Sequence, residues 1–358
     1  MTENNKIVAA MSGGVDSSVA AAILKERGRE VVGISLQLWN YNRDSDSRFD
    51  TCCSLDDLAD ARRVAHRLAI PFYILNMEKE FREEVVDYFV DEYLKGRTPI
   101  PCTLCNQRLK FDHLFKKAEG FGFYRVATGH YAEVVSDADG RYTIRRGSDR
   151  SRDQSYFLFN LSQEQLSRLE FPLGAMEKTE VRRIAGSLGL TVAEKPESRE
   201  ICFIPDNDYA RFLESRSGGA VFREGEIVDG SGEVLGHHRG YPAFTIGQRK
   251  GLNIGGLSEA HFVTGIDPEN NRITVGPKEH LVKSEFTASK VNWCLRRDEP
   301  FRAEVQIRYR HRAAAATVFP IVGARVRVVF DEGQVALTPG QAAVFYDDDR
   351  IVGGGWIE

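Results

Sequence analysis

The sequence predicts an α/β fold in which a doubly wound parallel sheet is followed by a small β-rich domain and an antiparallel β-barrel. Three observations support this architecture. Strand-like and helix-like segments alternate at first, which is typical of a parallel sheet with helices on its faces. Hairpin chemistry follows at 225–233, and segments with a period of two come after Pro277. We expect domains at 1–217, 218–277 and 278–358.

Glycines, prolines and helix-start residues set the bounds of the expected elements. Parallel strands are predicted at 6–11, 30–39, 71–76 and 124–129. Helices are predicted up to Arg27 and then at 54–69, 79–95, 107–118, 163–169, 177–190 and 208–215. The loop 96–105 contains two prolines and cannot be helical throughout. The barrel strands include 302–309, 324–329 and 341–346.

Length and composition bound the class of protein. The chain has 358 residues, 42% of them hydrophobic, and a formal net charge of −4, so any RNA site must be a local basic surface. No stretch approaches the roughly 18 apolar residues of a membrane span, and the apolar run at 7–11 is too short for a signal peptide. We therefore expect a cytoplasmic protein without a membrane partner. In that compartment its six cysteines indicate reactivity or metal binding rather than a disulfide framework.

The segment AMSGGVDSS at 10–18 predicts a phosphate-binding loop, because it joins a short strand to a helix through two glycines. Glycine lets backbone N–H groups approach an anion, and the helix N-terminus attracts its charge. The spacing fits neither the Walker pattern nor G-x-G-x-x-G. Asp16 is a candidate catalytic residue, although it could instead serve only the helix start. The expected nucleotide contacts are Ala10, Met11, Ser12, Gly13, Gly14, Val15, Asp16 and Ser17.

Cys102 and Cys105 form a C-x-x-C pair, and Cys202 follows about a hundred residues later. The pair alone fits redox, zinc or iron-sulfur chemistry, and the four-cysteine zinc pattern is absent from the sequence. Cys202 could complete a three-thiolate metal site or pair transiently with Cys105. Nucleophilic use would require cations that lower the thiol pKa.

Two groups of arginines are candidates for RNA contact. Arg145, Arg146, Arg150 and Arg152 cluster along the chain, and Arg308, Arg310 and Arg312 alternate around aromatic residues. Alternate residues of a strand share one face, so the second group would form a basic stripe suited to phosphates and bases. A solvated charged face explains the same pattern.

Six motifs, in order, make the chain resemble the tRNA-specific 2-thiouridylase (MnmA) family. They are AMSGGVDSS, TPIPCTLCNQRLKFDHL, VATGHYA, RDQSYFLF, EKPESREICFIP and FTIGQRKGLNIG. The first resembles the loop of the PP-loop ATP pyrophosphatases, which cleave ATP between the α and β phosphates. The resemblance implies adenylation of the C2 oxygen of the wobble uridine in tRNA, then its replacement by sulfur to give 2-thiouridine with release of AMP and pyrophosphate. Magnesium would assist at the phosphates.

The resemblance also implies roles for single residues. Cys105 matches the family's nucleophile, and Cys202 matches the cysteine that carries a persulfide received from a donor such as a cysteine desulfurase or relay protein. Cys102 stands where well-described members have aspartate. In members with this variant, Cys102, Cys105 and Cys202 resemble ligands of an iron-sulfur cluster, so cluster and disulfide routes both remain open. Adenine and ribose contacts would come from Leu36 and Gly129, and tRNA contacts from His130, Arg152, Asp153, Gln154, Arg308, Tyr309 and Gln341.

Two rival functions are compatible with the residues. One is a related PP-loop enzyme that thiolates a different RNA base. The other is a noncatalytic ATP-binding sensor, which would bind ATP without releasing pyrophosphate. The cysteine trio favours sulfur chemistry.

Overall fold

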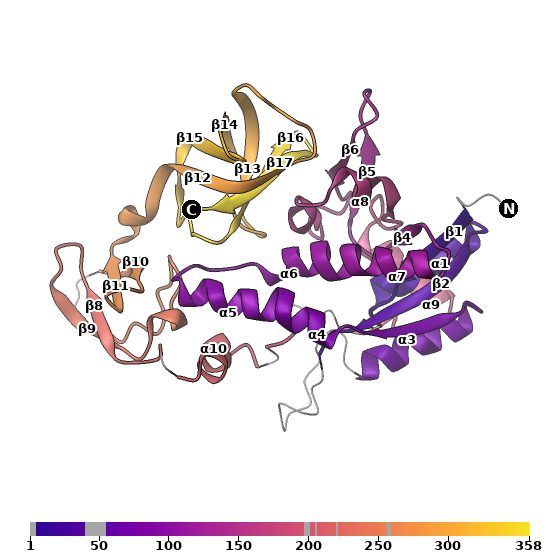
Figure 1. The fold of residues 1–358 in the computed structure, drawn as a ribbon, viewed down its shortest axis with the longest axis horizontal. Helices are drawn as coiled ribbons and strands as arrows, with labels where there is room; N and C mark the ends of the chain where they lie inside the picture. Colours follow the sequence, from indigo (N-terminus) through magenta and orange to yellow (C-terminus); the bar gives the residue numbers. More distant parts are fainter. Residues whose placement is uncertain (1–4, 40–54, 197–200, 205, 220, 256–258) are drawn as a thin grey trace. The chain divides into compact units, whose positions relative to one another are not determined.

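The computed structural model describes residues 5–39, 55–196, 201–204, 206–219, 221–255 and 259–358. The chain divides into two compact units, neither of which is continuous in sequence (Figure 1). The first unit comprises Met1–Val85, Pro101–Asn207 and Asp349–Val352, and the second comprises Val86–Ile100, Asp208–Asp348 and Gly353–Glu358. The boundaries expected at residues 217 and 277 stay predictions.

A five-stranded parallel sheet forms the centre of the first unit. Its spatial order is β3-β2-β1-β4-β7, and every pairing is parallel. The four predicted strands are confirmed, whereas β7 has two residues and was too short to predict. Since the chain adds strands on one side of β1 and then returns to its other side with β4, the order reverses at β1, where α/β sheets bind ligands. The strands are β1 (Lys6–Ala10), β2 (Glu30–Gln37), β3 (Phe72–Asn76), β4 (Arg125–Ala127) and β7 (Leu169–Glu170).

The helices follow the predicted order with local differences in winding. The predicted helix at 79–95 is α4, a π-helical stretch at Arg82–Val86, and α5. The described α-helices are α1 (Val15–Glu26), α3 (Leu55–Arg67), α4 (Glu78–Phe81), α5 (Asp87–Leu94), α6 (Pro101–Leu104), α7 (Leu114–Gly120), α8 (Gln163–Arg168), α9 (Lys178–Ser187) and α10 (Tyr209–Ser217). A capping box starts α8, because Ser162 and Gln165 each bond the other's backbone N–H. Among the described helices, none is long and apolar enough to cross a membrane.

In the first unit, β5 (Ala132–Ser136) and β6 (Tyr142–Arg146) form a hairpin. Strand β6 of this hairpin pairs with a short part of the last strand, β17 (Arg350–Ile357). Arg350 pairs with Arg145 in the ladder, and the Thr143 hydroxyl donates to the carbonyl oxygen of Ile351. The C-terminal strand therefore contributes to the first unit as well as to the second.

The second unit contains a mixed four-stranded sheet and a closed antiparallel barrel. The sheet has the order β10-β11-β8-β9 and includes the hairpin predicted at 225–233. Pairing between β12 and β17 closes the ring β12-β15-β14-β13-β16-β17, which removes exposed strand edges. The strands are β8 (Gly225–Val228), β9 (Val234–His238), β10 (Phe262–Asp267), β11 (Arg272–Gly276), β12 (Val282–Trp293), β13 (Phe301–Gln306), β14 (Ala314–Ile321), β15 (Arg325–Val335), β16 (Ala342–Asp347) and β17 (Arg350–Ile357).

Candidate functional site

The loop between β1 and α1 is shaped by a left-handed backbone at Gly13. Its φ is +79°, and a Cβ built there would stand 2.1 Å from the carbonyl oxygen of Asp57 on α3. Only glycine meets both conditions. Gly14 differs, because its φ is −93° and its Cβ would come no nearer than 3.7 Å to Ser12 Oγ. Treating the two glycines alike was therefore wrong: Gly13 sets the turn, and Gly14 leaves space beside the helix start.

The first turn of α1 presents backbone N–H groups, and the serine hydroxyls in this turn form hydrogen bonds within the loop. Gly14 is the N-cap residue and has no side chain to bond these groups. The hydroxyls of Ser17 and Ser18 donate to the Gly14 carbonyl oxygen at 3.1 and 2.8 Å, and Ser17 Oγ accepts from Ser12 N at 3.1 Å. An anion at this end of α1 would therefore meet N–H groups and the positive end of the helix dipole.

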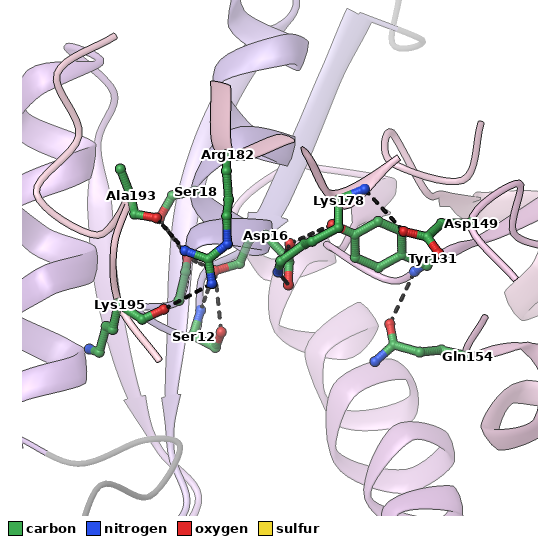
Figure 2. Close-up of polar contacts among 12 residues, drawn as sticks. Ser12, Asp16, Ser18, Tyr131, Asp149, Gln154, Lys178, Arg182, Ala193 and Lys195 are labelled. Atoms are coloured by element: carbon green, nitrogen blue, oxygen red, sulfur yellow. Dashed lines mark hydrogen bonds and ion pairs between the residues drawn. The ribbon is translucent and has the colours of Figure 1, made fainter. Parts of the chain in front are cut away.

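Asp16 is held by side chains from two distant parts of the chain (Figure 2). Lys178 Nζ donates to Asp16 Oδ1 at 2.7 Å and to Oδ2 at 2.8 Å, and the Tyr131 hydroxyl donates to Oδ1 at 2.7 Å. The Lys178 side chain is 9% exposed and that of Asp16 is 30% exposed. A residue that served only the helix dipole would not need such partners, so the arrangement favours a role for Asp16 in the site.

Residues of the loop 147–155 form hydrogen bonds with Lys178 and Tyr131, the two partners of Asp16. Asp149 Oδ2 accepts from the backbone N–H of Lys178 at 3.1 Å. Gln154 bonds Tyr131 twice, because its Oε1 accepts from Tyr131 N at 3.0 Å and its N donates to Tyr131 O at 2.9 Å. Gln154, which the resemblance assigned to tRNA, thus orients the tyrosine that bonds Asp16.

Gly129 lies just after β4 and permits a close approach to the phosphate loop. A Cβ at Gly129 would stand 2.7 Å from Asp16 C and from Ser17 N, so the chain after β4 packs directly on the first turn of α1. Leu36 is buried on β2, the other neighbour of β1. Contacts of Leu36 and Gly129 with adenine or ribose stay predictions.

The C-x-x-C pair lies in a helix, which corrects its expected place in a loop. Helix α6 begins at Pro101, because proline is favoured at a first helical position. Cys102 is exposed on α6, and Cys105 is buried at the start of a π-helical stretch, Cys105–His113. Such stretches often mark functional sites. Cys202 is partly exposed.

The described residues do not present a metal site. Among them, no group of three His, Cys, Asp or Glu residues could hold a metal ion. The expectation that Cys102, Cys105 and Cys202 are ligands of an iron-sulfur cluster stays a prediction. Whether they converge during the reaction stays a prediction.

The basic cluster in the first unit is largely paired with acidic residues. Arg145 bonds Glu133 at 2.6 Å, and Arg146 bonds Asp153 at 2.9 Å. Asp153 also accepts from the N–H groups of Gly147 and Ser155, both at 3.1 Å. Asp153 therefore orders its own loop.

Two further residues of the expected tRNA set also lie in the first unit. Arg152 is partly exposed, and its contact with a tRNA phosphate stays a prediction. His130 is buried, and its Nδ1 lies 2.6 Å from the Thr128 hydroxyl. Burial holds the pKa of His130 well below its ordinary value, and the charge of Lys110 lowers it further. In this conformation His130 is neutral at pH 7 and offers no cation to RNA.

In the second unit, the predicted basic stripe is wrong in its geometry. Strand β13 ends at Gln306, and the arginines at 308, 310 and 312 lie in the turn that follows. Gln306 stabilises this turn, because its Nε2 donates to the carbonyl oxygens of Arg308 and Tyr309 at 3.0 and 2.7 Å. Gln341 donates to the carbonyl oxygen of Thr98 at 2.8 Å. Arg308 and Tyr309 stay partly exposed, and their contact with tRNA stays a prediction.

Sequence reasoning missed Lys178 and assigned no role to Tyr131. Tyr131 is part of the VATGHYA motif, whereas Lys178 follows Asp16 by 162 residues. No local pattern links a lysine at a helix start to an aspartate so far away. Lys178 lies at the N-terminus of α9, where a cation is unfavourable. That position is the signal in the sequence that could have pointed to Lys178.

Comparisons with known proteins match the whole length of the chain. Family models described as the tRNA methyl transferase HUP domain, the tRNA methyl transferase PRC-barrel domain and the aminomethyltransferase beta-barrel domain match residues 5–206, 211–277 and 283–357. The tRNA-specific 2-thiouridylase MnmA of Geotalea uraniireducens is 53% identical over 365 residues, covering 100% of this chain and 97% of that one. The enzyme of the same name from Geobacter metallireducens is 53% identical over 366 residues, covering 100% and 98%. That from Clostridium perfringens is 48% identical over 355 residues, covering 99% and 98%.

Proposed function

Because the chain belongs to the tRNA-specific 2-thiouridylase family, we propose that this tRNA sulfurtransferase replaces the C2 oxygen of the wobble uridine with sulfur. ATP would adenylate that oxygen and release pyrophosphate, and AMP would then leave with the oxygen. The observation that carries the proposal is the phosphate loop at the switch point of the sheet, with Asp16 held between Lys178 and Tyr131. A sensor that only bound nucleotide would not need the three cysteines Cys102, Cys105 and Cys202 of the same unit.

The phosphate loop would bind ATP and stabilise the departing pyrophosphate. The N–H groups at the start of α1 are fixed by the turn at Gly13 and therefore need no rearrangement when charge develops. Asp16 is kept in one orientation by its two partners, next to those N–H groups. Magnesium would be held chiefly by phosphate oxygens and would neutralise their charge.

Sulfur would reach the adenylated uridine from Cys202. The terminal sulfur of a Cys202 persulfide would attack C2 and expel AMP. The Cys105 thiolate would then attack Cys202 Sγ, which releases 2-thiouridine and forms a Cys105–Cys202 disulfide that an external thiol reduces. Cys105 is buried, so its thiol would be shielded from competing oxidants until the substrate arrives.

A cluster held by Cys102, Cys105 and Cys202 would offer a free iron position for hydrosulfide. The roles proposed for Cys105 and Cys202 need no cluster, whereas the cluster route would use all three thiols. Iron and sulfide determination on anaerobically reconstituted protein would decide between the two routes.

The partners follow from the same chemistry. The tRNA would contact Arg152 in the first unit and Arg308 and Tyr309 in the second, and a persulfide donor protein would load Cys202. We place this reaction in the cytoplasm, where substrate tRNA and reduced thiols occur together.

The test is a reconstituted reaction with ATP, substrate tRNA and a persulfide donor. We expect one AMP and one pyrophosphate for each 2-thiouridine found at the wobble position by nucleoside mass spectrometry. A tRNA with cytidine at that position is the matched control and should give neither product. Release of ADP, or sulfur at another base, would contradict the proposal, the latter in favour of a related thiolase.

A further inference from the structure

Two side chains hold the helix directly after Cys105 to a second segment of the first unit. Asn106 is buried, and its Nδ2 donates to the carbonyl oxygen of Phe157 at 3.3 Å. Asn160 Nδ2 donates in turn to Gln107 Oε1 at 2.7 Å. The partners of these two bonds are 51 and 53 residues apart in the chain. The backbone is therefore fixed by tertiary contacts at the two positions that follow the thiol.

The segment that bonds Asn106 is itself connected to the phosphate loop. The N–H of Phe157 donates to the carbonyl oxygen of Gln154 at 3.0 Å. Gln154 forms the two hydrogen bonds with Tyr131 described above, and the Tyr131 hydroxyl donates to Asp16 Oδ1 (Figure 2). A series of hydrogen bonds among described residues therefore runs from Asp16 to Asn106.

The protein encloses the residues at the Cys105 end of this series. Asn106 is 3% exposed and Cys105 is 8% exposed. A buried amide that lost its carbonyl partner would leave a donor unsatisfied, which favours the observed bond over other arrangements. The Cys105 thiol is thus restrained by packing and by the bond of its neighbour, whereas Cys102 on α6 is exposed.

We propose that Asn106 is a positioning residue that holds Cys105 for the step in which its thiolate attacks Cys202 Sγ. This inference rests on the function proposed above. Before that step, the persulfide sulfur has displaced AMP, so a disulfide bond joins the uridine to Cys202. The attack forms the Cys105–Cys202 bond and breaks the bond between Cys202 Sγ and the transferred sulfur. The electron pair stays on that sulfur, which leaves in 2-thiouridine.

A direct contact with substrate is the competing role for Asn106. The structure disfavours that role, because the side chain is buried and its Nδ2 already donates to Phe157. A second alternative is that Asn106 only stabilises the fold. The three roles predict different products from the same variant.

The experiment compares Asn106→Leu with the wild type in a single turnover that starts from protein loaded with persulfide and freed of other thiols. Leucine has a similar shape but no donor for the Phe157 carbonyl oxygen. Misplacing a reacting group by about 1 Å can cost on the order of 100-fold in rate, so we expect release of 2-thiouridine to slow at least about tenfold. AMP release should stay within about threefold of the wild type, and a covalent protein–tRNA adduct should accumulate.

A small thiol distinguishes a misplaced Cys105 from a general loss of structure. Dithiothreitol added after AMP release can cleave the adduct in place of Cys105 and should release 2-thiouridine from Asn106→Leu. His113→Ala is the matched control, because it removes a 2.7 Å bond to Glu84 at the other end of the same π-helical stretch. It should release 2-thiouridine at the wild-type rate and form no lasting adduct.

The other outcomes overturn the inference. Slow AMP release with weakened tRNA binding would show that Asn106 contacts substrate. Unchanged release of 2-thiouridine would show that the bond to Phe157 is not needed. If Asn106→Leu does not fold, Gln107→Met replaces it, since Gln107 is partly exposed and loses only its bond to Asn160. The same adduct should then accumulate to a smaller extent, and its absence would contradict the proposed role.

A second measurement needs neither tRNA nor turnover. Cys102 and Cys105 lie on one tryptic peptide, 98–108, so mass spectrometry can count the labelling of both thiols by iodoacetamide in one sample. In Asn106→Leu the buried Cys105 should react at least about threefold faster than in the wild type, while the exposed Cys102 reacts as before. Equal changes at both thiols, or none at Cys105, would overturn the inference. If wild-type protein makes no 2-thiouridine, the proposed function fails, and this labelling still tests whether Asn106 holds Cys105.

Discussion

The phosphate loop and the arginine-rich loop at 145–154 belong to the same unit, but their motif residues are used differently. In the phosphate loop, the serine hydroxyls bond the Gly14 carbonyl oxygen, and the N-cap Gly14 supplies no side chain to the N–H groups at the start of α1. In the second loop, Asp153 and Gln154 form hydrogen bonds with other residues of the protein. A motif therefore identifies residues that matter without saying whether they face a ligand or hold those that do.

The largest effect should come from Gly13→Ala compared with Gly14→Ala. A Cβ at Gly13 would stand 2.1 Å from the Asp57 carbonyl oxygen at a φ of +79°, and the backbone strain alone costs about 1–3 kcal/mol. We expect Gly13→Ala to lower the unfolding free energy by more than that and to abolish adenylation. Gly14→Ala should fold like the wild type. Equal stabilities in urea denaturation would contradict this difference between the glycines.

Lys178→Met should have the next largest effect. It removes both bonds from Nζ to Asp16 and leaves a partly buried carboxylate without its cation. Adenylation, measured as pyrophosphate release, should fall by about tenfold or more. Tyr131→Phe removes one neutral donor to Asp16 and should cost only about 1 kcal/mol. If Tyr131→Phe is the more damaging change, Lys178 is not the main support of Asp16.

Arg152 and Arg308 should affect tRNA binding rather than adenylation. Arg152→Ala and Arg308→Ala should each weaken tRNA binding several-fold and reduce the slope of log affinity against log salt by about 1, with ATP affinity unchanged. Arg302→Ala is the matched control, because Arg302 is exposed on β13 but bonded to Asp331. Salt slopes identical to that control would assign both arginines to a solvated face.

His130 should give the smallest effect, seen in the pH dependence of stability. Its pKa is lowered in the folded state, so the unfolded chain binds the proton more readily and stability is lost as pH falls below about 6.5, by at most about 1.4 kcal/mol per pH unit. His130→Asn should flatten the decline in unfolding free energy between pH 7.5 and 5.5. If His130→Asn instead abolishes an acid-dependent gain in tRNA affinity, the histidine charges on RNA and the buried state is not the binding one.

The sequence predicts those features whose signals act between residues close together in the chain. The first four strands of the parallel sheet, the glycine turn and the barrel were predictable because alternation, glycine and helix caps act over a few residues. The Asp16–Lys178 pair was not, because it joins elements 162 residues apart. The helix at Cys102 was missed because Pro101 was interpreted as a breaker, although a first-turn proline costs no hydrogen bond. The end of β13 depends on the side chain of Gln306, which period-two patterning does not register.

The division of the chain into two units has a consequence for its synthesis. The chain passes from one unit to the other at five places, and the last piece of the first unit is Asp349–Val352. On the ribosome, the parallel sheet and the hairpin β5–β6 can form early, whereas the pairing of Arg145 with Arg350 waits until strand β17 has been made. The barrel closes with the same strand, through the pairing of β17 with β12. Loss of the final ten residues would therefore leave both units unfinished, although those residues carry none of the proposed chemistry.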